Sequence, residues 1–189
     1  LTRDGALVLA HDDHLLRRAG RAERVADLDL ADLRRIVVGE DATGGPQTIP
    51  TLDELLRLAA GRARVLLDLK LPDGNEARIL GAIRRAGAER GVVAGVRSLA
   101  ALRAFRDLAP GLATLAFGRG IDDVWALAEA GATIVRLWSP WVDAGALARA
   151  ALLGRPVWVM CGSPAAGDVG EATVAEVLDY RRRGVAAVL

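Results

Sequence analysis

From residue 60 onward, short apolar runs alternate with segments of helical periodicity. The apolar runs are 65–70, 92–96, 112–117, 133–137, 157–160 and 185–189. Such alternation with short connections predicts parallel strands that are joined by crossover helices. Strands that are apolar throughout are typical of a sheet that is covered on both faces. The expected fold class is therefore α/β.

The loops and the length narrow this class to a TIM-type (β/α)8 barrel. No GxGxxG or GxxxxGK[ST] loop follows the first strand, which disfavours doubly wound nucleotide-binding folds. About six parallel strands are expected after residue 60, whereas a barrel of eight strands normally needs about 250 residues. The 189 residues favour one domain. We therefore expect a single barrel domain over residues 1–189 that is incomplete, with its first strand–helix elements missing.

The composition disfavours several classes of function. Lys and Arg total 25 and Asp and Glu total 24, so the net charge of +1 predicts no nucleic-acid-binding surface. No apolar run approaches about 20 residues, so no stable membrane insertion is expected. The single cysteine, Cys161, excludes an internal disulfide, and no base lies near it in the sequence to activate a thiol nucleophile.

Asp68 and Lys70 are the first candidates for a functional site. In a barrel, the carboxyl ends of the strands face the active site. Asp68 and Lys70 extend one side of an apolar strand, because side chains alternate along it, and Lys70 is the only lysine of the chain. Charged groups are rarely buried unless they are paired or bind something. The pair indicates either a metal-ligating carboxylate beside a phosphate-binding cation, or an internal structural ion pair.

His11 is the second candidate. It directly follows residues 6–9, which we expect to form a return strand after a turn at Asp4 and Gly5. A histidine at the end of a strand can transfer protons near neutral pH. The alternative is a surface histidine beside a turn-forming aspartate, Asp12.

Three arginines and one tryptophan complete the candidates. Arg97, Arg119 and Arg136 lie at or just after the ends of predicted strands; they could contact an anion, but we expect them to be charges at the rim. Trp158 lies inside the predicted strand 157–160, where it could form the wall of a pocket or fill the core of the barrel.

Several blocks of the sequence resemble motifs of the glycerophosphodiester phosphodiesterase family. Residues 2–12, TRDGALVLAHD, are similar to the family's T-x-D-G-x-x-V-x-x-H-D, and residues 49–54, IPTLDE, to its I-P-T-L-x-E. Asp68-Leu69-Lys70 resembles its E-x-K. The strand with Trp158 is similar to V-W-T-V-N, and residues 184–186 to the start of G-V-D-G-I. Order and spacing agree over essentially the whole chain.

The resemblance implies a phosphoric diester hydrolase that cleaves glycerophosphodiesters to glycerol 3-phosphate and an alcohol. It also implies one divalent cation, Ca²⁺ or Mg²⁺, and histidines that act as acid and base. By position, His11 is the second catalytic histidine, Asp68 a metal ligand and Lys70 the lysine near the phosphate, while Trp158 is expected to bind substrate. The implied partner is a small-molecule phosphodiester.

The chain departs from the family pattern in ways that leave alternatives open. An H-R-G block and an E-x-D metal pair are expected to lie before residue 1, and Asp68 stands where Glu is usual. We therefore expect the 189 residues alone to be inactive. One alternative is a phospholipase D-like lipid hydrolase on the same barrel. The other is a barrel without catalysis that binds a phosphorylated ligand or a partner.

Overall fold

The described residues form two compact units, each of which is considered by itself. The computed structural model describes residues 1–40, 42–163 and 168–189. Unit 1 comprises Leu1–Ala63 and Arg78–Ala88, and unit 2 comprises Arg64–Ala77 and Glu89–Leu189. That residues 1–189 act as one domain stays a prediction.

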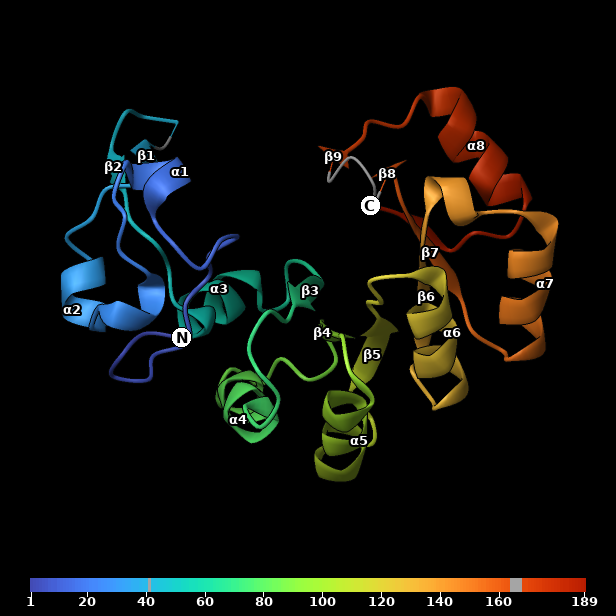
Figure 1. Cartoon of the computed structure of the whole chain (residues 1–189), viewed down its shortest axis with the longest axis horizontal. Helices are drawn as coiled ribbons and strands as arrows, with labels where there is room; N and C mark the ends of the chain where they lie inside the picture. The colour runs from blue at the N-terminus through green and yellow to red at the C-terminus, as the bar shows by residue number, and fades with distance from the viewer. Residues whose placement is uncertain (41, 164–167) are drawn as a thin grey trace. The chain divides into compact units, whose positions relative to one another are not determined.

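Six parallel strands form one sheet in unit 2, in the order β10-β7-β6-β5-β4-β3 (Figure 1). They are β3 (Val65–Asp68), β4 (Val92–Val96), β5 (Ala113–Ala116), β6 (Ile134–Trp138), β7 (Val157–Met160) and β10 (Ala187–Val188). From β3 to β7, each strand pairs with the next strand along the chain. The expected α/β class and the six parallel strands are confirmed, and the sheet is that of an incomplete (β/α) barrel.

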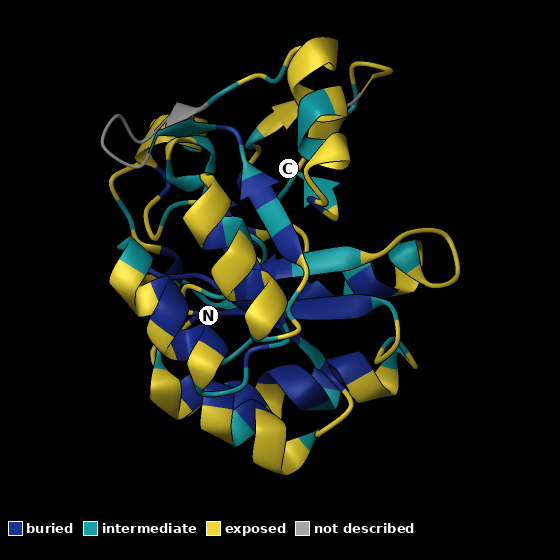
Figure 2. Ribbon diagram, turned by 90° about the vertical axis from the view of Figure 1, so that its right-hand side faces the viewer, coloured by how far each residue is buried: buried dark blue, intermediate teal, exposed yellow. Residues whose placement is uncertain are grey.

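Helices connect the strands of this sheet. They are α5 (Leu99–Leu108), α6 (Ile121–Glu129), α7 (Ala144–Leu152) and α8 (Val174–Arg182), with the 3-10 turn η2 (Ser139–Trp141) and the short ribbon β8 (Gly162–Ser163) and β9 (Asp168–Val169). The sequence encodes their starts: the Ser98 hydroxyl accepts from the Ala101 N–H at 3.0 Å, where α5 begins. Figure 2 shows buried residues along the strands and exposed residues on the helices.

The two faces of the sheet carry different side chains. Helices α5 and α6 contact β4, β5 and β6. The helix-covered face holds Leu67 and Ala94, which are register partners, and Ala116, Val135 and Val157, which form another row on the same side of the sheet. The alternate positions form a second cluster, which contains Val93, Leu115, Phe117 and Ile134, with Leu66, Ala113 and Trp158 packed against it. We call this second side of the sheet the inner face.

Unit 1 consists of short elements around its own core. They are α1 (Leu16–Ala19), η1 (Val25–Asp27), α2 (Leu30–Leu33), β1 (Gly39–Glu40), β2 (Pro46–Gln47) and α3 (Leu52–Ala59), and the residues of α4 (Glu76–Arg85) from Arg78 onward. The core contains Leu15, Val25, Leu33, Ile36 and Ile49.

The return strand predicted for residues 6–9 is wrong, although the turn before it forms. The Thr2 N–H donates to the Ala6 carbonyl at 3.0 Å, and Gly5 has a φ of +86°, a conformation that favours glycine. Val8 then forms an isolated antiparallel bridge with Thr51. Of the described residues 6–9, only Ala6 therefore bonds to a residue before the turn, whereas residues 7–9 pair with residues far along the chain.

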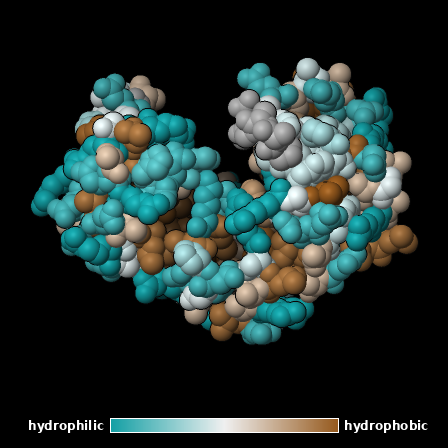
Figure 3. Space-filling model, in the orientation of Figure 1, coloured by the Kyte–Doolittle hydropathy of each residue, from teal (hydrophilic) through white to brown (hydrophobic). Residues whose placement is uncertain are grey.

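The surface of each unit is mainly hydrophilic on the side that Figure 3 shows, with hydrophobic residues in scattered places. Helix α8 exposes Val174, Val177 and Leu178. Among the described residues, no helix has the length and apolar character that a membrane span requires.

Candidate active site

The first two sequence motifs lie against each other in unit 1. Two backbone hydrogen bonds of 2.9 Å each join residues 7–9 to residues 50–52, on either side of the bridge between Val8 and Thr51. The last paired residue, Leu9, is two positions before His11. The pairing therefore fixes the backbone that leads to His11. The second motif therefore has a structural role, because its backbone holds the backbone of the first motif in place.

The second motif also starts α3. The Thr51 hydroxyl accepts from the Glu54 N–H at 3.2 Å, and the Glu54 carboxylate accepts from the Thr51 N–H at 2.8 Å. These two bonds form a capping box, whose members Thr51 and Glu54 are three residues apart in the sequence. Arg34 pairs with Glu54 at 2.5 Å. The Thr51 N–H, and then Arg34, lower the pKa of Glu54 to about 2, so Glu54 is ionised at neutral pH.

His11 is held by a carboxylate that is itself held by an arginine. The His11 side chain is 71% exposed, and its Nδ1 lies 2.7 Å from Asp12 Oδ1. Arg17 Nε donates to Asp12 Oδ2 at 2.7 Å. Arg17, and then His11, lower the pKa of Asp12 to about 2. A carboxylate at Nδ1 favours the tautomer with its proton on Nδ1, so that the lone pair is on Nε2. Sequence analysis treated Asp12 as a turn former and did not pair it with Arg17.

Asp68 and Lys70 form an ion pair at the end of β3 in unit 2, where Lys70 Nζ lies 3.8 Å from Asp68 Oδ2. Arg97, which follows β4, contacts Asp68 more closely, because its Nη2 and Nε lie 2.6 and 3.1 Å from Oδ1. All three side chains are roughly one-third exposed. The structural ion pair that the sequence left open is therefore present, and Arg97 is a member that sequence reasoning missed.

The surroundings of Asp68 do not by themselves fit a divalent cation. Ca²⁺ and Mg²⁺ need several oxygen ligands. In the part of the chain that the structure describes, no group of three or more His, Cys, Asp and Glu side chains could hold a metal ion. Both oxygens of Asp68 already face cations, Oδ1 with Arg97 and Oδ2 with Lys70. The metal-binding role of Asp68 stays a prediction, and no catalytic step is routed through a metal here.

A row of cationic and aromatic side chains crosses the inner face. Arg136 on β6 lies opposite Trp158 on β7 in the register of the sheet. When the β4–β5 and β5–β6 registers are continued by one residue, Arg97, Phe117 and Arg136 fall in the same row. The centroid of the Phe117 ring lies 4.2 Å from Arg97 Cζ and 4.4 Å from Arg136 Cζ. We call Arg97, Phe117, Arg136 and Trp158 the inner row.

Arg136 is buried, which the sequence did not predict. The residue is 1% exposed, and no described group accepts a hydrogen bond from its Nε. Its Cζ lies 4.3 Å from the centroid of the Trp138 ring. Burial, and then repulsion by Arg97, lower the pKa of Arg136 to about 10, so the guanidinium is still charged at neutral pH. The prediction of a rim charge is wrong for Arg136, because the residue lies within β6 rather than after it. Arg97 and Arg119 are exposed, as predicted.

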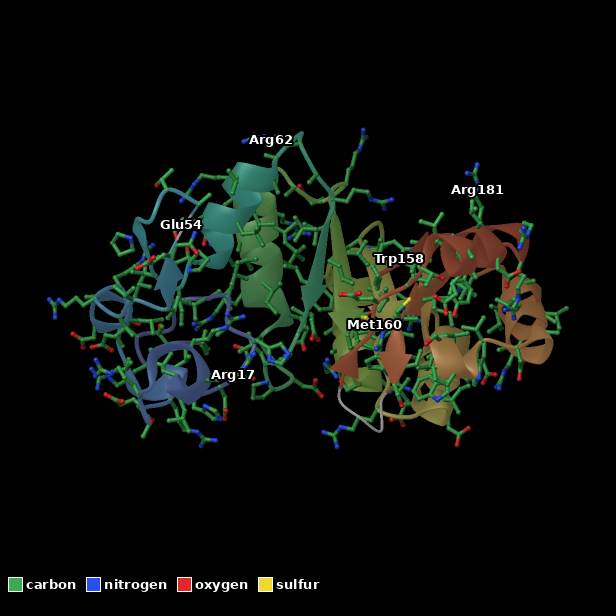
Figure 4. All side chains as sticks on the ribbon, turned by 90° about the horizontal axis from the view of Figure 1, so that it is seen from above. Arg17, Glu54, Arg62, Trp158, Met160 and Arg181 are labelled. Carbon is green, nitrogen blue, oxygen red and sulfur yellow. The ribbon has the colours of Figure 1, made fainter. Side chains whose placement is uncertain are left out.

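Trp158 is half-buried and packs against the cluster of the inner face. Figure 4 shows Trp158 and Met160 following one another along β7, whereas Arg181 points outward from α8. The structure thus brings Trp158 next to Arg136, and Asp68 next to Lys70 and Arg97. His11 belongs to unit 1, so its convergence with these residues stays a prediction, as does the substrate-binding role of Trp158.

Comparison with solved structures confirms the fold. Glycerophosphodiester phosphodiesterase from Agrobacterium tumefaciens str. C58 matches with a TM-score of 0.79 and 20% identity, over 99% of this chain and 78% of its own. An Oleispira antarctica phosphodiesterase in complex with the product sn-glycerol-3-phosphate matches with a TM-score of 0.75 and 18% identity, over 100% and 77% of the two chains. The glycerophosphodiester phosphodiesterase from Thermotoga maritima matches with a TM-score of 0.67 and 14% identity, over 100% of this chain and 77% of its own. No curated protein matches the chain significantly.

The family is established by the sequence rather than by these structural similarities. The model of the glycerophosphoryl diester phosphodiesterase family matches residues 1–104, which is more than half of the 189 residues. The matched part contains the three motif blocks that end at residues 12, 54 and 70. The chain therefore belongs to the glycerophosphoryl diester phosphodiesterase family.

Proposed function

We propose that the protein is a phosphoric diester hydrolase, which cleaves glycerophosphodiesters to glycerol 3-phosphate and an alcohol. The family match over residues 1–104 carries this proposal, because that segment includes His11, Asp68 and Lys70. The Oleispira antarctica phosphodiesterase, which has the same fold, is described with sn-glycerol-3-phosphate as its product. That product is the one expected from a glycerophosphodiester.

In the proposed reaction, His11 transfers the proton. The Asp12 carboxylate, 2.7 Å from Nδ1, keeps the ring oriented and the lone pair on Nε2. Nε2 then accepts the proton of the attacking hydroxyl, which belongs to the substrate or to water, or returns it to the departing alkoxide. Arg17 acts indirectly: by binding Asp12 Oδ2, it keeps the carboxylate ionised and in place.

Lys70 is proposed to bind a phosphoryl oxygen. Its side chain is 39% exposed, and Asp68 holds its ammonium group at 3.8 Å. An ammonium group next to a phosphoryl group stabilises negative charge that develops on the oxygens. The divalent cation, Ca²⁺ or Mg²⁺, stays a prediction, and the roles of His11 and Lys70 stated here do not depend on it. Trp158 is proposed to contact the substrate from β7.

The test assays the full-length protein, including any residues that its gene encodes before Leu1. We expect release of glycerol 3-phosphate from sn-glycero-3-phosphocholine, with loss of activity in EDTA and recovery with Ca²⁺ or Mg²⁺. His11→Asn should lower kcat by about 10²- to 10⁴-fold, the usual contribution of a general acid or base. His14→Asn is the matched control, because His14 is an exposed histidine on the same segment. Equal loss in both variants, or full activity of His11→Asn, would contradict the assigned role.

A barrel that binds a phosphorylated ligand without catalysis is the second candidate. The observation that favours it is the pairing of Asp68 with Arg97 and Lys70, in a described structure without a group of three metal-ligating side chains. Ligand binding without turnover of any glycerophosphodiester by the full-length protein would support this candidate. Hydrolysis of intact phospholipid but not of the deacylated diester would instead identify the phospholipase D-like alternative.

A further inference from the structure

The side chains near the carboxyl ends of β3, β4 and β6 carry an excess of positive charge. Lys70 and Arg97 both contact the Asp68 carboxylate. Arg136 is buried and forms no salt bridge with a described residue; the Asp68 carboxylate attracts it only at longer range and already pairs with Lys70 and Arg97. A buried charge is strongly unfavourable unless a counter-charge or hydrogen-bond acceptor meets it. Among the described residues, Arg136 has neither an ion-pair partner of its own nor an acceptor for its Nε–H.

The aromatic rings around Arg136 do not fulfil this requirement. Phe117 and Trp138 lie 4.4 and 4.3 Å from its Cζ, so they attract the guanidinium through their faces. A ring face neither cancels the charge nor accepts the Nε–H bond, which has no acceptor among the described groups. What the rings do is hold the guanidinium plane in one orientation. A guanidinium that is fixed in this way is ready to form paired hydrogen bonds with an anion.

We propose that Arg136 is an anion-binding residue, which receives a tetrahedral oxyanion of the phosphate type at the inner row. The planar fork of guanidinium donors matches the spacing of phosphate oxygens. The Arg97 side chain is 35% exposed and Trp138 is half-buried, so we expect a small anion to reach Arg136 by displacing side chains rather than backbone. The inference rests on the proposed function and deepens it, because the inner row contains Trp158; phosphate binding is measured without turnover, so the two can fail separately.

The test measures the binding of inorganic phosphate to the full-length protein by isothermal titration calorimetry, with chloride used to keep the ionic strength constant. Wild-type protein should show saturable binding. Arg136→Gln should weaken it at least about tenfold, as expected when a charge-assisted hydrogen bond is lost, and Arg136→Lys should lie between the two. Arg149→Gln is the matched control: Arg149 also stacks on a tryptophan, at 4.6 Å from Trp125, but it already pairs with Glu129 at 2.5 Å.

Thermal unfolding separates this role from a purely structural one. Phosphate should raise the Tm of the wild-type protein and of Arg149→Gln by the same amount, and it should raise the Tm of Arg136→Gln by less. If Arg136 only supports the rings, Arg136→Gln lowers the Tm but leaves phosphate binding unchanged, and the proposal fails. Absence of saturable binding by the folded wild-type protein also overturns it. Should Arg136→Gln not fold, Arg136→Lys decides the same question, because it retains the charge but not the fork.

A second set of titrations determines whether Arg136 binds the phosphoryl group or an anionic head group of the ligand. Glycerol 3-phosphate and a glycerophosphodiester with an anionic head group are titrated against wild-type protein and Arg136→Gln. If Arg136 binds the phosphoryl group, the variant loses affinity for both ligands by similar factors. If it binds the head group, the loss is larger for the anionic diester. Equal affinity of the wild-type protein and the variant for both ligands contradicts the proposal.

Discussion

Replacing Asp68 with Asn tests the charge balance at the end of β3. The substitution keeps the shape of the side chain but removes the negative charge that pairs with Lys70 and Arg97. The Arg97 contact has good geometry, with two nitrogens at 2.6 and 3.1 Å from Oδ1. Both partners are 35% exposed, so solvent screens the pair. Exposed pairs contribute up to about 1 kcal/mol, so we expect a loss of about 1 kcal/mol, or roughly 2–4 °C in Tm for a chain of this size.

Urea unfolding, followed by tryptophan fluorescence and far-UV circular dichroism, measures this loss. The effect should be largest at about 0.01 M salt and should shrink at about 1 M, where charges are screened within roughly 3 Å. Asp73→Asn is the control: Asp73 accepts from the Ser98 hydroxyl at 2.8 Å, which an amide oxygen can also do. Phosphate should bind Asp68→Asn more tightly, because Arg97 is released. A variant that is as stable as the wild type at low salt, with unchanged phosphate affinity, would refute this reasoning.

Three further predictions concern residues that hold the two candidate sites in place. Thr51→Ala removes the cap of α3 and should lower the stability of unit 1 by about 1 kcal/mol, seen as faster hydrogen exchange of the α3 amides; unchanged exchange would contradict it. The pKa of Glu54 falls from 4.5 when unfolded to about 2 when folded, so its stabilisation is complete above pH 4.5 and is lost as the pH falls toward 2. Urea midpoints between pH 6 and pH 2 should therefore fall less steeply for Glu54→Gln than for the wild type, and parallel curves would argue against the capping contribution. Gly95→Ala would place a Cβ 2.9 Å from the Leu67 carbonyl and 3.0 Å from Phe117 Cδ2. It should displace the Phe117 ring and weaken phosphate binding, and an affinity equal to that of the wild type would show that the ring does not orient Arg136.

The strands of unit 2 could be predicted because their pattern is local. The runs 92–96 and 157–160 coincide with β4 and β7, and the runs 65–70, 112–117 and 133–137 differ from β3, β5 and β6 by one or two residues at an end. The pairing of residues 7–9 with 50–52 could not be predicted in this way. A short apolar segment can pair with any exposed backbone, and no local pattern names its partner. The capping box at Thr51 was predictable, since both of its members are three residues apart in the sequence.

The burial of Arg136 was predictable in principle, whereas its lack of a counter-charge was not. Leu137 and Trp138 continue the apolar run beyond Arg136, so the strand does not end there, and alternation places Arg136 on the same side as Trp138. Which carboxylate it could meet depends on the order of the strands. Because β5 lies between β4 and β6, Phe117 meets both Arg97 and Arg136, and only Arg97 is on the strand next to Asp68. The same strand order that pairs Arg97 with Asp68 leaves Arg136 without an ion-pair partner among the described residues, since Asp68 attracts it only at longer range, and this is why its direct counter-charge is expected from a ligand.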